Sequence, residues 1–202
     1  MSMQAYQRFS PESKEGPYRV HDYLQLTGDE ERCELLYGHF YLSPAPSVVH
    51  QLVVGAIAQR LRDAARLTGA MAVESPIDVL LSDHTVVQPD VVYIAREQLG
   101  IVTRERIEGS PDLIVEVLSP RTSRRDRIEK MELYRKAGVP EYWLIDPAAC
   151  TFEFLDLRGE HPVIRLAQDN RYESECLTGI QLDINGFWQE IDEILARMEP
   201  QE

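Results

Sequence analysis

The sequence is poor in cysteine, in long apolar runs and in positive charge. Its three cysteines, Cys33, Cys150 and Cys176, are widely spaced and form no C-x-x-C unit, which argues against a disulfide framework and against a zinc site. The apolar runs are far too short to span a bilayer, and the first residues show no charged-then-apolar signal pattern, so we expect a cytoplasmic protein without membrane contact. The net charge of -13 repels polyanions and argues against a general nucleic-acid coating role.

One segment reverses this charge. From Ser119 to Ala137 the chain carries seven bases and three acids, a local charge of +4. The pattern fits either a solvated helix face or a surface that faces the phosphates of a nucleic acid. Under the second interpretation Arg121, Arg124 and Arg125 are the candidate nucleic-acid contacts.

The chain shows no repeat, no low-complexity run and no linker. We therefore expect a flexible N-terminal segment, residues 1–16, followed by a single domain over residues 17–198. Helical spacing and capping residues predict helices over 18–26, 47–67, 119–137 and 188–197. Tyr37-Gly38 is a plausible hairpin turn between strands at 32–36 and 39–42.

Further strands are predicted at 71–73, 77–81, 86–94, 113–118, 141–146, 151–156, 163–166 and 182–184. Those at 86–94 and 113–118 lack the alternation of a half-exposed strand, which is typical of strands buried on both faces. The predicted fold class is α/β, with a central mixed sheet flanked by helices and additional antiparallel strands.

Two carboxylates fall in or beside these apolar strands. Glu116 lies in the middle of the strand at 113–118, and a Pro89-Asp90 pair is part of the strand before it. An ionised carboxylate in a sheet core costs several kcal/mol unless a cation or a hydrogen-bond donor meets it. Metal-assisted hydrolysis of a phosphodiester uses such carboxylates to bind Mg²⁺ or Mn²⁺, and a nearby cation to orient water or offset charge. Asp90, Glu116 and Lys130 fit these catalytic roles.

A second Pro-Asp pair, Pro111-Asp112, competes for the role of first carboxylate. Asp112 and Glu116 are four residues apart on one strand, about 13 Å at roughly 3.3 Å per residue, which is too far to share an ion. Asp90 on a neighbouring strand can approach Glu116 to about 5 Å. We therefore assign Asp90 to the metal site and Asp112 to the start of the strand.

This order of a Pro-Asp pair, a spacer and a strand glutamate resembles the PD-(D/E)XK nuclease superfamily, and the finer pattern is similar to its Uma-two branch of bacterial restriction-endonuclease-like proteins. The similarity extends over residues 20 to 190, and its long central run is specific although no single short motif is. The motifs that carry it are Cys33-Glu34-Leu35-Leu36-Tyr37-Gly38, Ser43-Pro44-Ala45-Pro46 with His50, Val87-Gln88-Pro89-Asp90, Pro111 through Pro120, Asp126, Lys130, Tyr134, Gly138 through Trp143, and Asp146-Pro147.

The chain departs from the superfamily at one position. The superfamily's lysine normally stands two residues after the glutamate, where this chain has Leu118. The resemblance implies Lys130 as the replacement, on a helix that returns over the sheet. Asp126, Lys130 and Tyr134 share a face of that helix, so Asp126 and Tyr134 are secondary candidates. The alternative is an ordinary helix pair of Asp126 with Lys130, worth a few tenths of a kcal/mol.

The resemblance also places an N-terminal glutamate near the ion, which makes Glu34 a further catalytic candidate. Its alternative is a polar hairpin residue. His50, at the start of the first long helix, is a secondary candidate, although a lone histidine there is more often a packed or capping residue than a ligand. The resemblance further implies that the carbonyl of Val117 joins Asp90 and Glu116 as a metal ligand.

The leading hypothesis is a Mg²⁺- or Mn²⁺-dependent DNA endonuclease. A homodimer is expected, because cutting both strands of a duplex generally requires two sites. A catalytically inactive nucleic-acid or protein binding module on the same fold is the alternative. A third interpretation is structural: Glu116 is a buried, protonated or hydrogen-bonded residue with a raised pKa and no metal.

Overall fold

The protein is described here by a computed structural model, which covers residues 16–26 and 33–198. The predicted flexible segment, residues 1–16, lies outside this part except for Gly16, whose N–H donates to the carbonyl of Tyr37 at 2.7 Å. None of the helices within these two ranges combines the length and the apolar character that a bilayer crossing requires.

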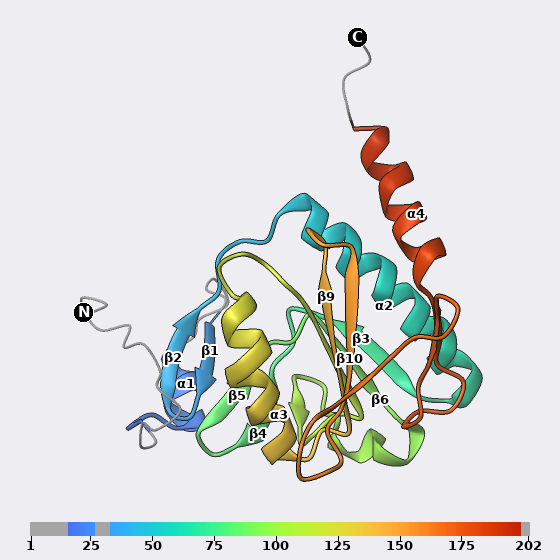
Figure 1. Cartoon of the computed structure of the whole chain (residues 1–202). Helices are drawn as coiled ribbons and strands as arrows, with labels where there is room; N and C mark the ends of the chain where they lie inside the picture. The colour runs from blue at the N-terminus through green and yellow to red at the C-terminus, as the bar shows by residue number, and fades with distance from the viewer. Residues whose placement is uncertain (1–15, 27–32, 199–202) are drawn as a thin grey trace.

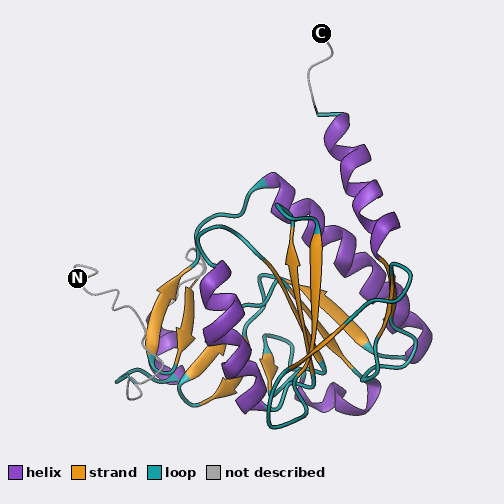
Figure 2. Cartoon of the chain, viewed as in Figure 1, coloured by secondary structure: helices purple, strands orange, loops and turns teal. Residues whose placement is uncertain are grey.

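Two larger sheets form the body of the chain (Figures 1 and 2). The six-stranded sheet has the order β11 (Val163–Arg165), β10 (Thr151–Asp156), β9 (Glu141–Asp146), β8 (Leu113–Val117), β6 (Val91–Ile94) and β3 (Met71–Glu74). The five-stranded sheet has the order β2 (His39–Leu42), β1 (Cys33–Leu36), β5 (Thr85–Val87), β4 (Val79–Ser82) and β7 (Ile107–Glu108). A small two-stranded sheet joins β12 (Arg171–Glu173) to β13 (Gln181–Asp183).

Helices cover both faces of the six-stranded sheet (Figure 1). The helical elements are α1 (Val20–Leu26), α2 (Val48–Thr68), the 3-10 turn η1 (Arg96–Ile101), the π-helical turn η2 (Arg125–Lys130), α3 (Met131–Ala137) and α4 (Ile184–Ala196). Along β8, Val115 packs in the hydrophobic cluster that contains α2 and α4, and Ile114 in the cluster that contains α3. This burial on both faces explains why β8 shows no polar alternation. The predicted α/β class with a mixed sheet is confirmed, since β8 and β9 are parallel and their outer neighbours antiparallel.

The predicted long helix at 47–67 forms as α2, and its ends show why. Ser47 accepts the N–H of His50 at the start, and Gly69 closes the helix at a φ of 74°. An N-cap hydroxyl satisfies an otherwise free N–H, and glycine adopts a positive φ without strain. The N-cap places His50 in the first turn of the helix, beside Asp90, which directly precedes β6.

The prediction of one strand over 86–94 is wrong. The chain breaks at Gln88-Pro89-Asp90, so that β5 belongs to the five-stranded sheet and β6 to the six-stranded sheet. Proline has no N–H to donate to a strand ladder, which is why the regular pairing stops there. The break carries the chain from one sheet to the other and places Asp90 at their junction.

The helix predicted over 119–137 also differs in detail. Its first half is the π-helical turn η2, and the α-helical part begins only at Met131. The hydroxyl of Tyr142 donates to the carbonyl of Asp126 in this turn, at 3.1 Å. The terminal helix begins at Ile184, four residues earlier than predicted, because Asp183 caps it through the N–H of Gly186. The short strands β7 and β12 were not predicted.

Candidate active site

Four of the predicted site residues come from four elements that meet at the junction of the two sheets. Glu116 lies in β8, and Asp90 directly precedes β6, whose Val91 pairs with Val115. Glu34 lies in β1 of the other sheet, and Lys130 ends the π-helical turn η2. The two sheets approach each other here because the break at Pro89 divides one stretch of chain between β5, the neighbour of β1, and β6, the neighbour of β8.

Asp90 is held from two sides. Its Oδ2 accepts the N–H of Val117 at 2.8 Å and lies 3.3 Å from Nε2 of His50. Burial lowers the pKa of His50, but the hydrogen bond and charge of Asp90, with a backbone hydrogen bond at Val117, outweigh it and raise that pKa. His50 therefore serves both as part of the capped first turn of α2 and as a direct neighbour of Asp90.

Lys130 joins the carboxylates of the two sheets. Its Nζ lies 2.8 Å from Oε1 of Glu116 and 2.8 Å from Oε1 of Glu34, and 3.9 Å from Oδ1 of Asp126. The hydroxyl of Tyr134 donates to the same Oε1 of Glu116 at 2.7 Å. A lysine that is 4% exposed can remain charged here because three carboxylates surround it.

The electrostatics of this cluster follow from burial. Burial raises the pKa of Glu116 well above its usual range, and the charge of Lys130 opposes that increase. Burial likewise raises the pKa of Asp126, again opposed by Lys130. Burial lowers the pKa of Lys130, but the charges of Glu116, Glu34 and Asp126 outweigh it and raise the pKa. One lysine cannot neutralise three buried carboxylates, so the cluster holds a proton more readily than exposed carboxyl groups do.

These side chains open into a cavity of about 600 Å³. The cavity is walled by the loop at Ser43–Ser47, the start of α2, the end of β8 and the start of the basic segment. A larger groove of about 1180 Å³ lies over β11, β12 and β13, and it contains none of the residues predicted from the sequence. The cavity at the sheet junction is therefore the candidate active site.

The structure brings most of the predicted residues to this cavity. The lining residues include Glu34, His50, Asp90, Glu116, Val117, Arg121, Arg125, Asp126 and Lys130. Arg124 is exposed and lies outside the lining, and Tyr134 reaches Glu116 from beneath, fully buried. Asp112 is not part of the site: its carboxylate accepts the N–H of Ala95 at 2.7 Å.

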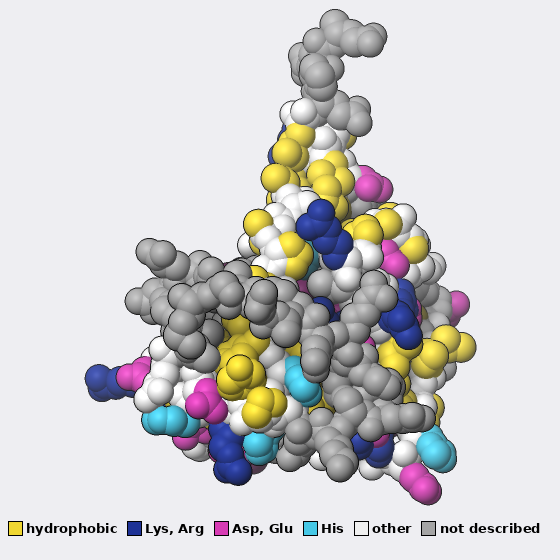
Figure 3. All heavy atoms as spheres, turned by 90° about the vertical axis from the view of Figure 1, so that its left-hand side faces the viewer, with side chains coloured by type: hydrophobic (Ala, Val, Ile, Leu, Met, Phe, Trp, Pro, Cys, Tyr) yellow, Lys and Arg dark blue, Asp and Glu magenta, His cyan; other side chains and the backbone are white. Residues whose placement is uncertain are grey.

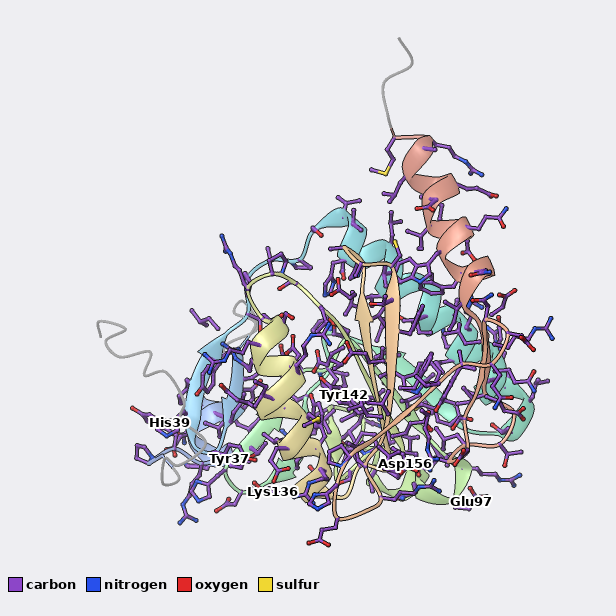
Figure 4. All side chains as sticks on the ribbon, in the orientation of Figure 1. Tyr37, His39, Glu97, Lys136, Tyr142 and Asp156 are labelled. Atoms are coloured by element: carbon purple, nitrogen blue, oxygen red, sulfur yellow. The ribbon has the colours of Figure 1, made fainter. Side chains whose placement is uncertain are left out.

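Two contributors were missed by the sequence analysis. The backbone N–H of Gln88 donates to Oε1 of Glu34 at 2.9 Å, and its position directly before Pro89-Asp90 was the available signal. Tyr142 lies in the interior of the molecule beside α3 (Figure 4), where its ring meets that of Tyr134 edge-on at 5.0 Å. Its position in an apolar strand gave no sign of the contact with the Asp126 carbonyl.

The free oxygen atoms of the two carboxylates fit a hard cation. The chain's own donors bind Oδ2 of Asp90 and Oε1 of Glu116, and among the described side chains none donates to Oδ1 of Asp90 or Oε2 of Glu116. Within the same residues, no three His, Cys, Asp or Glu side chains converge as a ready metal cage. Mg²⁺ is usually bound through one or two carboxylates and several waters, so two free carboxylate oxygens suit it.

Comparisons with known proteins agree with this fold. The crystal structure of a "putative nuclease belonging to DUF820" from Anabaena variabilis matches with a TM-score of 0.72 and 18% sequence identity, covering 87% of this chain and 99% of that one. No curated protein matches the chain. The model of the Uma2 family, described as "Putative restriction endonuclease", matches residues 20–185. The chain therefore belongs to the Uma2 family.

Proposed function

We propose that the protein is a metal-dependent DNA endonuclease whose active site is the cavity at the sheet junction. The observation that carries the proposal is the buried arrangement of Asp90, Glu116 and Lys130, in which each carboxylate keeps one oxygen to which no described residue donates. Membership of the Uma2 family and the nuclease-like fold support the same activity. Buried charges are costly, and a purely structural role gives no reason to keep five of them around one cavity.

The proposed roles follow from the carboxylate oxygens of Asp90 and Glu116 to which no described residue donates. Asp90 and Glu116, with the carbonyl of Val117, would hold Mg²⁺ or Mn²⁺, which would supply an activated water and neutralise charge on the phosphate. Lys130 would orient the attacking water or stabilise the transition-state charge. Tyr134 and His50 fix the orientation of Glu116 and Asp90 through the hydrogen-bonded oxygen of each.

Cleavage of DNA by the purified protein tests this proposal. We expect metal-dependent cutting of supercoiled plasmid, linear duplex or single-stranded DNA with Mg²⁺ or Mn²⁺, and an increase in melting temperature on addition of Mn²⁺. A folded protein that cuts none of these substrates would favour the inactive binding module. A melting temperature that does not respond to metal would favour Glu116 as a hydrogen-bonded structural residue.

Arg121 and Arg125 are the proposed contacts to the DNA backbone. The other bases of the segment pair with carboxylates of the chain: Arg127 with Asp146 and Glu153, Lys130 as above, and Arg135 and Lys136 with Glu132. In the described residues no ion pair involves Arg121, Arg124 or Arg125. The ring of Tyr41 supports Arg125, whose guanidinium carbon lies 4.4 Å from the ring centroid.

Replacing Arg121 and Arg125 together by alanine should weaken DNA binding and lower the slope of log K against log salt by about 2, because about one counterion is released per phosphate contact. Fluorescence anisotropy at several salt concentrations measures this. Arg135→Ala is the matched control, since Arg135 is already bound to Glu132. An unchanged salt slope in the double variant would contradict the assignment.

The raised pKa of Glu116 predicts a pH dependence of metal binding. A protonated carboxyl group cannot bind the ion, so protons compete with Mn²⁺ below the raised pKa of Glu116. Mn²⁺ affinity should therefore increase with pH and binding should release protons, both effects fading above that pKa. Calorimetry in buffers of different ionisation enthalpy measures the release. Metal binding that releases no protons and keeps the same affinity at every pH at which the protein stays folded would contradict Glu116 as a ligand.

A homodimer is part of the same proposal, because each strand of a duplex needs its own site. The helix α4 extends beyond the rest of the chain (Figure 1), and it exposes hydrophobic side chains on the surface (Figure 3). Met198, just after α4, is 57% exposed. Light scattering measures the oligomeric state.

A further inference from the structure

Glu34 differs from the other carboxylates of the site in its sheet and in its depth. It comes from β1 in the five-stranded sheet, whereas Asp90 and Glu116 belong to the six-stranded sheet. The exposed fraction of the side chain is 3% for Glu34, 7% for Glu116 and 11% for Asp90. Glu34 therefore lies at the floor of the cavity, and Asp90 nearest its mouth.

The contacts of Glu34 lead to the lysine. Its Oε1 accepts the N–H of Gln88 at 2.9 Å and lies 2.8 Å from Nζ of Lys130. The backbone donor fixes the carboxylate because Gln88 directly follows β5, the strand that pairs with β1. Lys130 is itself the group that separates Glu34 from Glu116, since its ammonium is bound to both.

A hydrated cation would enter from the mouth of the cavity. Mg²⁺ and Mn²⁺ keep several waters when bound by few carboxylates, so they need the solvent-facing end of the site. Asp90 and Glu116 are the carboxylates with the larger exposed fractions and so lie towards that solvent-facing end. At the floor, a hydrated cation on the other oxygen of Glu34 would lie beside the Lys130 ammonium and would have to give up more of its waters than at Asp90, which is costly for Mg²⁺.

We infer that Glu34 is a positioning residue that holds the ammonium of Lys130 against Glu116, and that it is not a metal ligand. The inference rests on the nuclease site proposed above and assigns a separate task to its deepest carboxylate. Asp90 and Glu116 serve the cation, and Glu34 serves the lysine. The side chain of Lys130 thereby couples the two sheets, because its ammonium binds Glu34 of β1 on one side and Glu116 of β8 on the other.

Separate measurements of metal binding, DNA binding and cleavage distinguish these tasks. In Glu34→Gln the cleavage rate at saturating DNA and Mn²⁺ should fall about tenfold or more, because a charge-assisted bond to the lysine is lost, while Mn²⁺ and DNA affinities stay at the parental value. Glu116→Gln should lose Mn²⁺ affinity as well. Asp112→Asn, a buried carboxylate outside the cavity, is the control that should change neither.

The position of Lys130 can be followed without any activity. The sequence contains three lysines, Lys14, Lys130 and Lys136, so NMR of lysine labelled at Cε and Nζ gives three signals. The double substitution Lys14→Arg and Lys136→Arg leaves only the signal of Lys130. We expect the buried ammonium signal to shift and to lose protection from exchange in Glu34→Gln but not in Asp112→Asn. Glu34→Asp, which keeps the charge, should recover part of the parental signal and rate.

The outcomes separate this inference from the nuclease proposal. If the parent protein cuts no DNA, the nuclease proposal fails, and the lysine signal still decides whether Glu34 holds Lys130. If Glu34→Gln leaves the Lys130 signal and the cleavage rate unchanged, the positioning role is wrong. If Mn²⁺ affinity falls as far in Glu34→Gln as in Glu116→Gln, Glu34 is a metal ligand and the inference is overturned.

Discussion

Replacing Glu116 by glutamine is expected to lower the metal-dependent cleavage rate by roughly 10³-fold or more, since in the proposed site the metal and the lysine would both act through this side chain. Its Oε1 binds Lys130 and Tyr134, and its Oε2 is free for the cation. Glutamine has the same shape but no charge, and its amide group brings a donor to a place already filled with donors. A gel assay of plasmid cleavage, with the Mn²⁺-induced change in melting temperature, measures both losses.

The control for this variant is Asp112→Asn. Asp112 directly precedes β8, the strand of Glu116, and is 8% exposed, but it accepts a backbone N–H and is absent from the lining of the cavity. It should keep parental cleavage, whereas Asp90→Asn should lose it with Glu116→Gln. Cleavage by Glu116→Gln at the parental rate would remove the basis of the nuclease proposal.

The central part of the site could be predicted because its signals are local. Glu116 is a charged residue in an apolar run, and the spacing to Asp90 fits two neighbouring strands. The structure pairs those strands in the register that sets Asp90 beside Glu116. A strand that is buried on both faces leaves few interpretations for a carboxylate, so the sequence pattern was informative there.

The remainder depends on contacts that no local pattern contains. Pro89 can be read from the sequence as a strand breaker, but the sequence does not tell which sheet β5 and β6 each join. The position of Glu34 relative to Lys130 depends on that assignment of strands to sheets. The π-helical turn was also hidden. The four-residue spacing of Asp126 and Lys130 also places both on one face of an α-helix, so the sequence periodicity cannot distinguish a π-helical turn from an α-helical one.

Replacing Lys130 by methionine is expected to have the largest effect on stability. The variant leaves Glu34, Glu116 and Asp126 buried without the cation that binds all three. Removing one partner of a buried ion pair costs about 3–5 kcal/mol, and methionine keeps most of the side-chain volume, so the loss at neutral pH should be electrostatic. Cleavage should fall as well, because the group that orients water or offsets charge is gone.

The pH dependence of this loss identifies its cause. Burial already raises the pKa values of Glu116 and Asp126, and Lys130 is the group that opposes the increase, so both should rise further in the variant. An acid whose folded-state pKa is raised contributes stability that is present below its unfolded pKa, about 4.3 for glutamate, and lost as the pH rises through the folded value. The deficit of Lys130→Met should therefore be small in mild acid and grow towards alkaline pH.

Urea unfolding at a series of pH values measures this deficit. Lys136→Met is the matched control, because Lys136 lies near the end of α3 (Figure 4) and, among the described residues, forms its one ion pair with the half-exposed Glu132 at 3.4 Å. Mn²⁺ should stabilise Lys130→Met more than the parent, since the variant's carboxylates lack any other cation. A deficit that is the same at all pH values would show that the lysine contributes packing and not charge, and the carboxylate cluster could then no longer be explained as a site organised around Lys130.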